Sequence, residues 1–543
     1  MQLVMSNCGS VGSNCKGRAR PMVALMSPPL SSPVAPSDEL AAADTGASFS
    51  QLIRNITRQG AIVLLTRGAA ILLGFAVTIC VARALGPAGL GRFKLGSVVV
   101  TLITTICVLG LDRALLRYIP MLETRGGAGI RRLLLRSGSV VFGLSLLFGG
   151  LLVVAAPLIA DRYFHSPEMT GVLRMFSIQI PALALVRFLA GAATAAKRID
   201  FSSKITNVFS PALFLLLVPL IALAYPGVFG VITARSFSQF AAVIWLVLFL
   251  ARRYQRVQEQ SQVDIGTFKS YLKLSIPLFF IVAGYQLLGQ TDTMVLGYFV
   301  SEKEVGIYSV AAKVSAFVLI GPDILLPIVA PLFSELNEKR DRASLEALFT
   351  TMTKWFCYSA LIIFACMAIL RVEILHVFGN AFTAGTTVLL IVATGQLANA
   401  LTGPTGALLT MTGKQKLEVR NVACLVLINL LLNLWWVPRM GKSGAALSTA
   451  VSIALINVIK LVQVYQIYGF RAYSLRLVKG LMAIGAAAFV GYLLRDVLFK
   501  VGCGPYTIMP AAAFGFIITA AIVFWLFGLE KEDRMAFVAL RRR

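Results

Sequence analysis

The segment QTDTMVLGYFVSEKEVGIYSVAAK, residues 290–313, contains the pattern that decides the fold. It places Asp292 inside an apolar run, follows the run with a short charged turn, and opens a second apolar run at Gly306. A weaker copy lies upstream, where Leu85-Gly86 leads to Gly91. The Leu-Gly pairs of the two copies are 211 positions apart, and Gly91 and Gly306 are 215 apart. Similar offsets recur along the chain, which predicts an internal duplication.

The composition places this duplication in a membrane. Of the 543 residues, 58% are hydrophobic and only 14% are charged, and the mean hydropathy is +0.82. A helix needs about 20 apolar residues to cross a bilayer, and such runs recur here without two-residue alternation, so we predict spanning helices and not a barrel. The formal net charge of +26 lies mainly between the apolar runs. That distribution suits anionic lipid headgroups and argues against nucleic-acid binding.

The apolar runs predict an all-α integral membrane protein with about 14 transmembrane helices, in two six-helix lobes related by the internal repeat plus two extra C-terminal helices. The predicted parts are a disordered N-terminal tail (1–48), an N-terminal lobe (49–251), a cytoplasmic linker (252–270), a C-terminal lobe (271–470), two additional helices (471–528) and a basic cytoplasmic tail (529–543).

Orientation follows from the basic residues. The N-terminal flank, the even-numbered connections and the C-terminal tail hold most of the Lys and Arg outside the spans, so the positive-inside rule predicts both termini in the cytoplasm. Six spans per repeat is an even number, so both copies enter the membrane the same way up. We therefore expect a cavity between two copies related by an axis along the membrane normal.

Charged side chains inside the spans carry the functional information, because charge at bilayer depth normally faces a wet cavity or a partner. Four basic residues have no acidic residue one helical turn away: Arg67, Arg187, Arg235 and Lys313. Unpaired cations in a cavity suit a phosphate or diphosphate, which a guanidinium holds with two parallel hydrogen bonds. With Arg113 they are the candidate substrate-binding residues. The alternative for each is a side chain that reaches lipid headgroups or caps a neighbouring helix.

Asp292 has two candidate roles. It is predicted either to form a structural ion pair with Lys313, the favoured role, or to respond to a coupling ion, in which case transport draws on a Na⁺ or H⁺ gradient. Pro322, Pro327 and Pro404 are the hinge candidates, because proline interrupts helix hydrogen bonding and permits kinks.

No catalytic or metal-binding pattern is visible in the sequence. A Walker-type glycine loop, a Ser-His-Asp group and cysteine pairs with metal-ligand spacing are all missing from it, so we predict neither an enzyme nor a cofactor or metal site.

Several motifs resemble those of a known family. The pattern Asp292-x-x-x-x-Gly297, followed by Val305-Gly306-Ile307-Tyr308, is similar to the Wzx-type polysaccharide flippases. These are lipid-linked oligosaccharide translocases of the multidrug/oligosaccharidyl-lipid/polysaccharide exporter superfamily. Further similar stretches start at Ile374, Met411 and Gly441, and the resemblance covers about residues 49–528.

The resemblance implies a V-shaped pair of six-helix lobes that alternates between inward-open and outward-open states. It implies that the cargo is an undecaprenyl-pyrophosphate-linked oligosaccharide repeat unit, moved across the bacterial inner membrane for O-antigen, capsule or exopolysaccharide biosynthesis. The expected partners are this lipid-linked substrate, membrane lipids, and the polymerase and chain-length proteins of the pathway, and the expected functional state is a monomer.

Three rival functions are open at this point. A flippase for the lipid-linked precursor of peptidoglycan would also have fourteen spans and a basic cavity. A cation-coupled multidrug antiporter of the same superfamily would be expected to carry acidic groups in the first lobe, whereas the first span has Arg67 and no carboxylate. A membrane-bound polymerase or ligase would need long loops, and the odd-numbered connections are short.

Overall fold

The computed structural model describes residues 38–124, 129–196, 199–254, 265–473 and 477–526. The chain divides into two compact units, residues 1–50 and 51–543, and the following description concerns the second unit. Within it we call residues 51–254 the N-terminal half and residues 265–526 the C-terminal half. All regular secondary structure in the described ranges is helical.

The N-terminal half ends with α8, and the C-terminal half begins with α9. The elements before this junction are α1 (Asp38–Val108), α2 (Leu111–Thr124), α3 (Ile130–Arg162), α4 (Met169–Ser177), α5 (Gln179–Ala195), α6 (Ile199–Lys204), η1 (Ile205–Phe209), α7 (Ser210–Ala224) and α8 (Val228–Tyr254). The elements after it are α9 (Ile265–Phe299), α10 (Glu302–Ser315), η2 (Ala316–Leu319), α11 (Ile320–Glu338), α12 (Arg342–Ile369), α13 (Arg371–His376), η3 (Asn380–Gly385), α14 (Thr386–Leu401), α15 (Thr405–Met411), α16 (Gln415–Tyr468), α17 (Leu477–Lys500) and α18 (Pro505–Leu526).

Ten helices in the described ranges are long and apolar enough to cross a membrane, or up to twelve if each of two bent helix pairs counts as one span. Two of the ten, 70–124 and 415–468, are 55 and 54 residues long. A straight helix of that length would reach about 80 Å, more than twice the thickness of a bilayer core. Each contains a glycine with non-helical backbone angles, Gly86 in α1 and Gly441 in α16, where two helices meet. The all-helical membrane fold is thus confirmed, whereas the number fourteen stays a prediction.

The two repeats contact each other through a reciprocal pair of glycines. A Cβ atom added at Gly91 would lie 1.8 Å from the carbonyl oxygen of Glu302, and one added at Gly306 would lie 1.9 Å from that of Pro87. Both members of this relation are offset by 215 residues, because Pro87 corresponds to Glu302 as Gly91 corresponds to Gly306. Each copy therefore packs the start of one helix against a glycine of the other copy, as a two-fold relation requires.

The Leu-Gly pairs of the duplication are not structurally equivalent. Gly86 is the break in α1, with a φ of 64°, whereas Gly297 lies inside α9. A Cβ atom on Gly297 would lie 2.5 Å from the side chain of Leu95 and 3.0 Å from that of Phe164. The offset of 215 residues describes the repeat, and the offset of 211 is four residues short of it.

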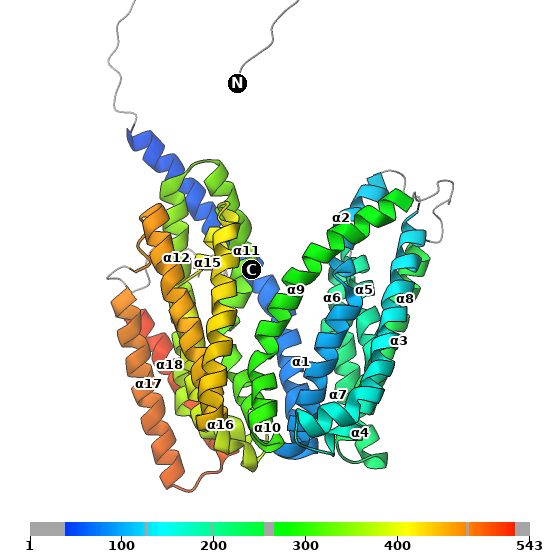
Figure 1. Cartoon of the computed structure of the whole chain (residues 1–543). Helices are drawn as coiled ribbons and strands as arrows, with labels where there is room; N and C mark the ends of the chain where they lie inside the picture. Colours follow the sequence, from blue (N-terminus) through cyan, green and yellow to red (C-terminus); the bar gives the residue numbers. More distant parts are fainter. Residues whose placement is uncertain (1–37, 125–128, 197–198, 255–264, 474–476, 527–543) are drawn as a thin grey trace, which may run out of the picture. The chain divides into compact units, whose positions relative to one another are not determined.

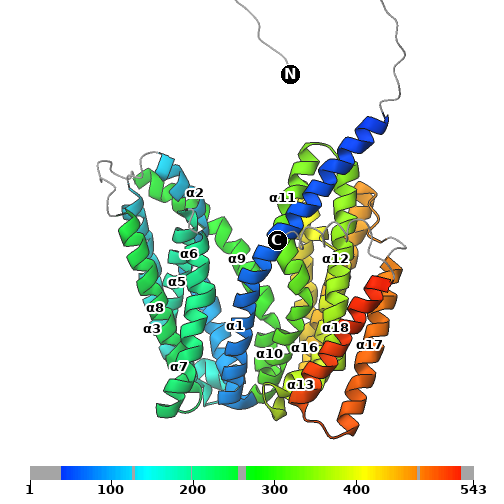
Figure 2. The same cartoon turned by 180° about the vertical axis from the view of Figure 1, so that it is seen from behind.

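Two helices connect the halves (Figures 1 and 2). In α9, the segment near Tyr271 packs on the N-terminal half, where the Tyr271 hydroxyl donates a hydrogen bond to the carbonyl of Leu111 at 2.8 Å. The last part of α9 packs on α16, and a 56° bend separates its segments Phe268–Gly284 and Gly289–Phe299. In α1, the Phe75 ring lies 5.1 Å from that of Phe317, in the C-terminal half.

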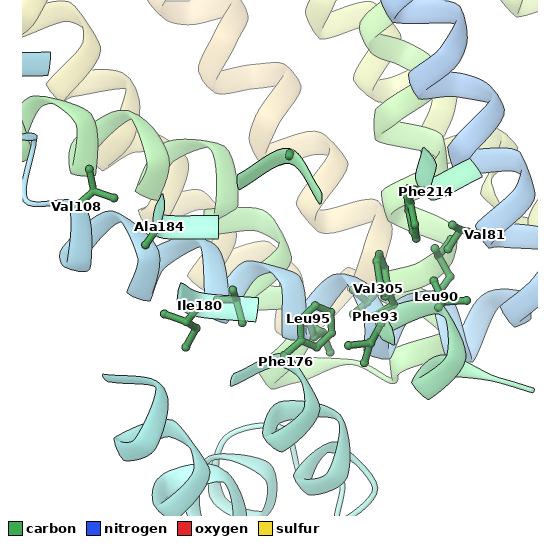
Figure 3. Packing of buried hydrophobic residues seen from close by; sticks show 14 of the residues in the cluster. Val81, Leu90, Phe93, Leu95, Val108, Phe176, Ile180, Ala184, Phe214 and Val305 are labelled. Atoms are coloured by element: carbon green, nitrogen blue, oxygen red, sulfur yellow. The ribbon is translucent and has the colours of Figure 1, made fainter. Parts of the chain in front are cut away.

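The core of the N-terminal half begins where the second part of α1 crosses α4. Phe93 and Phe176 place their ring centroids 5.5 Å apart, and both side chains are buried. Figure 3 shows these rings close to Leu95, with Val305 of α10 beside them. The apolar core of the N-terminal half is therefore continuous with the start of α10.

Some predicted boundaries and hinges differ from the structure. Residues 38–48 of the predicted tail are helical in α1, where Glu39, Leu40 and the following alanines favour a helix, and residues 265–270 of the predicted linker belong to α9. Residues 1–37 and 529–543 lie outside the described ranges.

The hinge candidates lie at helix irregularities. Pro322 follows the 3₁₀ turn η2, Pro327 lies inside α11, and Pro404 lies between α14 and α15. The bends above 40° in the described ranges lie elsewhere, in α9 and between α4 and α5. Hinge motion at these prolines stays a prediction.

Candidate functional site

A cavity of about 1210 Å³ lies within residues 51–543 and is lined by both repeats. Side chains of α1, α2, α5 and α8 line it from the N-terminal half, and side chains of α9 and α10 line it from the C-terminal half. Its charged lining consists of five basic and two acidic residues, namely Lys94, Arg113, Arg187, Arg235, Lys313, Asp112 and Asp292. The cavity is therefore cationic.

Three of the lining cations, Lys94, Arg235 and Lys313, have no ion-pair partner among the described residues. Arg235 and Lys313 both lie close enough to Lys94 to repel its charge. The Arg235 guanidinium lies over the Phe93 ring, 5.5 Å from its centroid, which offsets part of the cost of burying the charge. Like charges gathered from two helical repeats, with no anion between them, form a site for an anionic ligand.

The other cations of the cavity are partly compensated. Arg113 lies 3.8 Å from the carboxylate of Asp112, its neighbour in sequence. The Arg187 Nη1 group donates to the Thr105 hydroxyl at 2.9 Å, and Asp112 lies within electrostatic range of Arg187. A Cβ atom on Gly191 would lie 2.9 Å from Asp112, so α2 and α5 are in close contact at this wall. These contacts fix the orientation of the arginines while leaving the wall with a net positive charge.

The structure thus brings most of the sequence-predicted residues to one place. Arg113, Arg187, Arg235, Lys313 and Asp292 all line the same cavity. Arg67 falls among the residues whose side chains lie outside the description.

Asp292 does not form the favoured ion pair with Lys313. Its carboxylate accepts hydrogen bonds from neutral groups on three chain segments. The Tyr308 hydroxyl donates at 2.7 Å and the Thr449 hydroxyl at 2.5 Å to Oδ2, and the Asn433 amide donates at 2.8 Å and the Asn429 amide at 3.3 Å to Oδ1. The reason is placement: Lys313 lies on α10 beyond Tyr308, whereas α16 supplies two amides and a hydroxyl directly opposite Asp292.

The surroundings of Asp292 also contain unsatisfied acceptors. The side-chain amide oxygens of Asn429 and Asn433 are both buried and have no hydrogen-bond partner among the described residues. A buried amide oxygen without a donor costs free energy, and native proteins explain such groups by water, an ion or a strained function. One carboxylate and two amide oxygens form a set of hard oxygen ligands that suits a small cation such as Na⁺.

The sequence analysis missed Lys94 and the partners of Asp292. Lys94 precedes the apolar run that begins at Leu95, so it was counted with a connection and not with a span. Asn429 and Asn433 are spaced i, i+4 in an apolar run and so share one face of a helix, which was an available signal. Thr449 is 157 positions from Asp292 and carries no such signal.

Most other membrane charges of the C-terminal half are neutralised within that half. Lys460 Nζ lies 2.5 Å from Glu418 Oε1, and Arg495 lies 2.8 Å from Glu373, whose side chain is 4% exposed. Lys442 lies 2.9 Å from Glu304. The unpaired cations of the cavity are therefore a local feature and not a general property of the chain.

The fold and the cavity define the class, a multi-pass helical transporter of the multidrug/oligosaccharidyl-lipid/polysaccharide exporter superfamily. A sequence model described as polysaccharide biosynthesis protein matches residues 56–337, just over half of the chain, and the chain belongs to this family. A second family model, MatE, matches residues 277–435. The resemblance found in the sequence motifs is thereby confirmed.

Named relatives and a solved structure agree with this family. The amylovoran biosynthesis protein AmsL of Erwinia amylovora is 26% identical over 315 residues, 57% of this chain and 79% of that protein. The probable low-salt glycan biosynthesis flippase Agl15 of Haloferax volcanii is 25% identical over 169 residues, 31% of this chain and 36% of that protein. The structure of the lipid II flippase MurJ in an inward-closed conformation superposes with a TM-score of 0.67 at 14% identity, covering 86% of this chain and 98% of that one. At that identity the likeness to MurJ shows the fold alone.

Proposed function

We propose that this protein is a flippase that translocates undecaprenyl-pyrophosphate-linked oligosaccharide repeat units across the bacterial inner membrane, by alternating access, for O-antigen, capsule or exopolysaccharide biosynthesis. The observation that carries the proposal is the cavity of a polysaccharide biosynthesis family member, lined by Lys94, Arg235 and Lys313 without anionic partners. A diphosphate is the part of such a cargo that these cations would hold. The names of AmsL and Agl15 support the glycan as the attached group.

The predicted orientation gives the cavity a direction. Gly191 and Ser202, which flank the fourth connection, line the cavity, whereas the first and seventh connections are packed against each other through Pro87 and Glu302. If both termini are cytoplasmic, the cavity is open to the cytoplasm, where lipid-linked repeat units would be loaded. Polymerase and chain-length proteins as partners, and a monomeric state, stay predictions.

The function is tested by reconstituting the full chain in liposomes that contain a fluorescent undecaprenyl-diphosphate oligosaccharide. An impermeant quencher then reports the fraction of cargo in the outer leaflet over time. We expect rapid exchange with the protein, and with protein-free liposomes as the baseline. Two further cargoes separate the rival functions: the lipid-linked peptidoglycan precursor, and a lipophilic organic cation. Transport of the cation with a static glycan lipid would overturn the proposal, because a cationic cavity repels such a drug.

We further propose that transport is coupled to a Na⁺ or H⁺ gradient through Asp292. The support is the carboxylate set among neutral donors, with the unsatisfied oxygens of Asn429 and Asn433 beside it. Imposing each gradient separately on the liposomes shows which ion accelerates transport. Asp292→Asn keeps the size of the side chain and should abolish the acceleration, whereas Asp161→Asn, at the exposed end of α3, should keep it. Transport that ignores both gradients would refute the coupling and leave the cargo assignment intact.

A further inference from the structure

The packed end of the two repeats contains an ion-pair cluster that the cavity does not use. Arg92, in the second part of α1, forms ion pairs with Glu302 at the start of α10 and with Glu168, which precedes α4. The Ser166 hydroxyl donates to the second oxygen of the Glu302 carboxylate at 2.8 Å. The Glu302 side chain is 15% exposed and that of Glu168 is 63% exposed. The pair of Arg92 with Glu302 is thus the better shielded one, and it joins the N-terminal half to the C-terminal half.

The backbone around this pair is in tight contact. The Gly91 and Gly306 contacts described above lie next to Arg92 and one turn after Glu302, respectively. Nearby, the Tyr163 hydroxyl donates to the carbonyl of Met294 at 3.2 Å, and the Tyr163 ring lies 5.4 Å from that of Tyr298. This end of the molecule is therefore closed by contacts between the repeats, and alternating access requires that they separate.

The helices that carry the ion pair also carry cavity cations. Lys94 follows Arg92 by two residues, and Lys313 follows Glu302 by eleven, which is close to three helical turns and about 16 Å along the axis. At the closed end the two helices attract each other through opposite charges. In the cavity the same two helices carry Lys94 and Lys313, which repel each other.

We propose that Arg92 and Glu302 form a latch that keeps the second mouth of the cavity shut while the cavity is empty, and that an anionic cargo releases it. A diphosphate between Lys94 and Lys313 replaces their repulsion by attraction to a shared anion. The two helices then move together in the cavity and apart at the latch. The release step rests on the proposed function; the latch itself rests only on the contacts above.

The latch is tested with a reporter cysteine, Ser97→Cys, which lines the cavity five residues after Arg92, in a full-length chain whose native cysteines are replaced. A membrane-impermeant maleimide is applied from the side of the closed mouth, without any cargo. We expect Arg92→Gln and Glu302→Gln each to raise the labelling rate about tenfold, the change that a shift of about 1.4 kcal/mol between two states produces. Arg92→Lys, which keeps the charge, should label nearly as slowly as the parent.

The matched control is Glu304→Gln. It removes an ion pair of similar length, with Lys442, two residues from Glu302, but within the C-terminal half alone. Its labelling rate should equal that of the parent. If Arg92→Gln and Glu302→Gln also label at the parent rate, or if Glu304→Gln opens the mouth equally, the latch is wrong.

A second measurement covers variants that fail to fold. A disulfide between Arg92→Cys and Glu302→Cys should stop cargo exchange in liposomes, and reduction should restore it. Exchange that continues in the cross-linked protein would overturn the latch. Finally, adding the glycan diphosphate lipid to the parent should raise the labelling rate. If the latch variants behave as expected and this last addition has no effect, the latch stands and the cargo assignment fails.

Discussion

The two halves of the molecule are copies of one helical unit that use charge in opposite ways. In the N-terminal half, Lys94 and Arg235 line the cavity without anionic partners. In the C-terminal half, Glu418 with Lys460 and Glu373 with Arg495 form pairs within the half. Only Lys313 and Asp292 face the cavity from that side. The duplication therefore preserved the packing contacts at an offset of 215 residues and not the chemistry of the lining.

This difference separates charges that serve binding from charges that serve stability. An unpaired cation in a membrane protein raises the free energy of the folded state and is retained for a ligand. A buried pair whose partner is removed leaves an uncompensated charge, which is strongly destabilising. Mutations in the two halves should accordingly affect different measurements.

The largest expected effect is on stability in the C-terminal half. Glu373→Ala leaves Arg495 without its partner, and the loss should be roughly 3–5 kcal/mol, as for other broken buried pairs. Thermal unfolding in detergent would show it as a clearly lowered midpoint. The control is Asp496→Ala, which removes the exposed pair with Lys500 and should cost no more than about 0.5 kcal/mol. Equal midpoints for the two variants would contradict a structural role for the buried pair.

The next effect tests what the halves share. Gly91→Ala and Gly306→Ala place a Cβ atom within 2 Å of a backbone oxygen of the other repeat, so each should cost about 1–3 kcal/mol or more and impair glycan export. If the two-fold relation holds, the two variants should be affected alike. Gly143→Ala and Gly485→Ala have open space at the Cβ position and should behave as the parent. A severe defect in only one of the first pair would break the symmetry argument.

Arg235 should show the opposite balance from Glu373. Arg235→Ala removes an unpaired charge, so the unfolding midpoint should stay equal or rise, while cargo exchange falls at least about tenfold because a charge-assisted contact is lost. The control is Arg252→Ala, on an exposed position near the end of the same helix. A lowered midpoint with normal exchange would show that Arg235 serves structure.

The smallest expected effect concerns the ion site. Tyr308→Phe removes one of two hydroxyl donors to Oδ2 of Asp292, worth about 1 kcal/mol. The concentration of the coupling ion at half-maximal transport should shift by a few-fold, with the maximal rate nearly kept. Tyr465→Phe, an exposed position on α16, serves as the control. An unchanged ion dependence would separate Tyr308 from the coupling.

Much of the fold could be predicted from the sequence, because apolar runs and their glycine punctuation are local signals. The pairing of Gly91 with Gly306 and the gathering of Arg187 and Arg235 followed from such patterns. The partners of Asp292 did not, since α16 approaches α9 from more than 130 residues away. Nor did the neutralisation of Glu373 by Arg495, which depends on how α17 docks.

The first helix has a consequence for exchanging parts between relatives. Besides the Phe75 contact, the Arg83 guanidinium donates to the carbonyl of Val377 at 2.8 Å and to the Tyr506 hydroxyl at 2.7 Å. Part of α1 thus belongs, by its contacts, to the far end of the chain. A chimera joined at the boundary between the halves would inherit a foreign first helix against its own α13 and α18. Such hybrids should assemble only when the graft carries the residues facing that helix along with it.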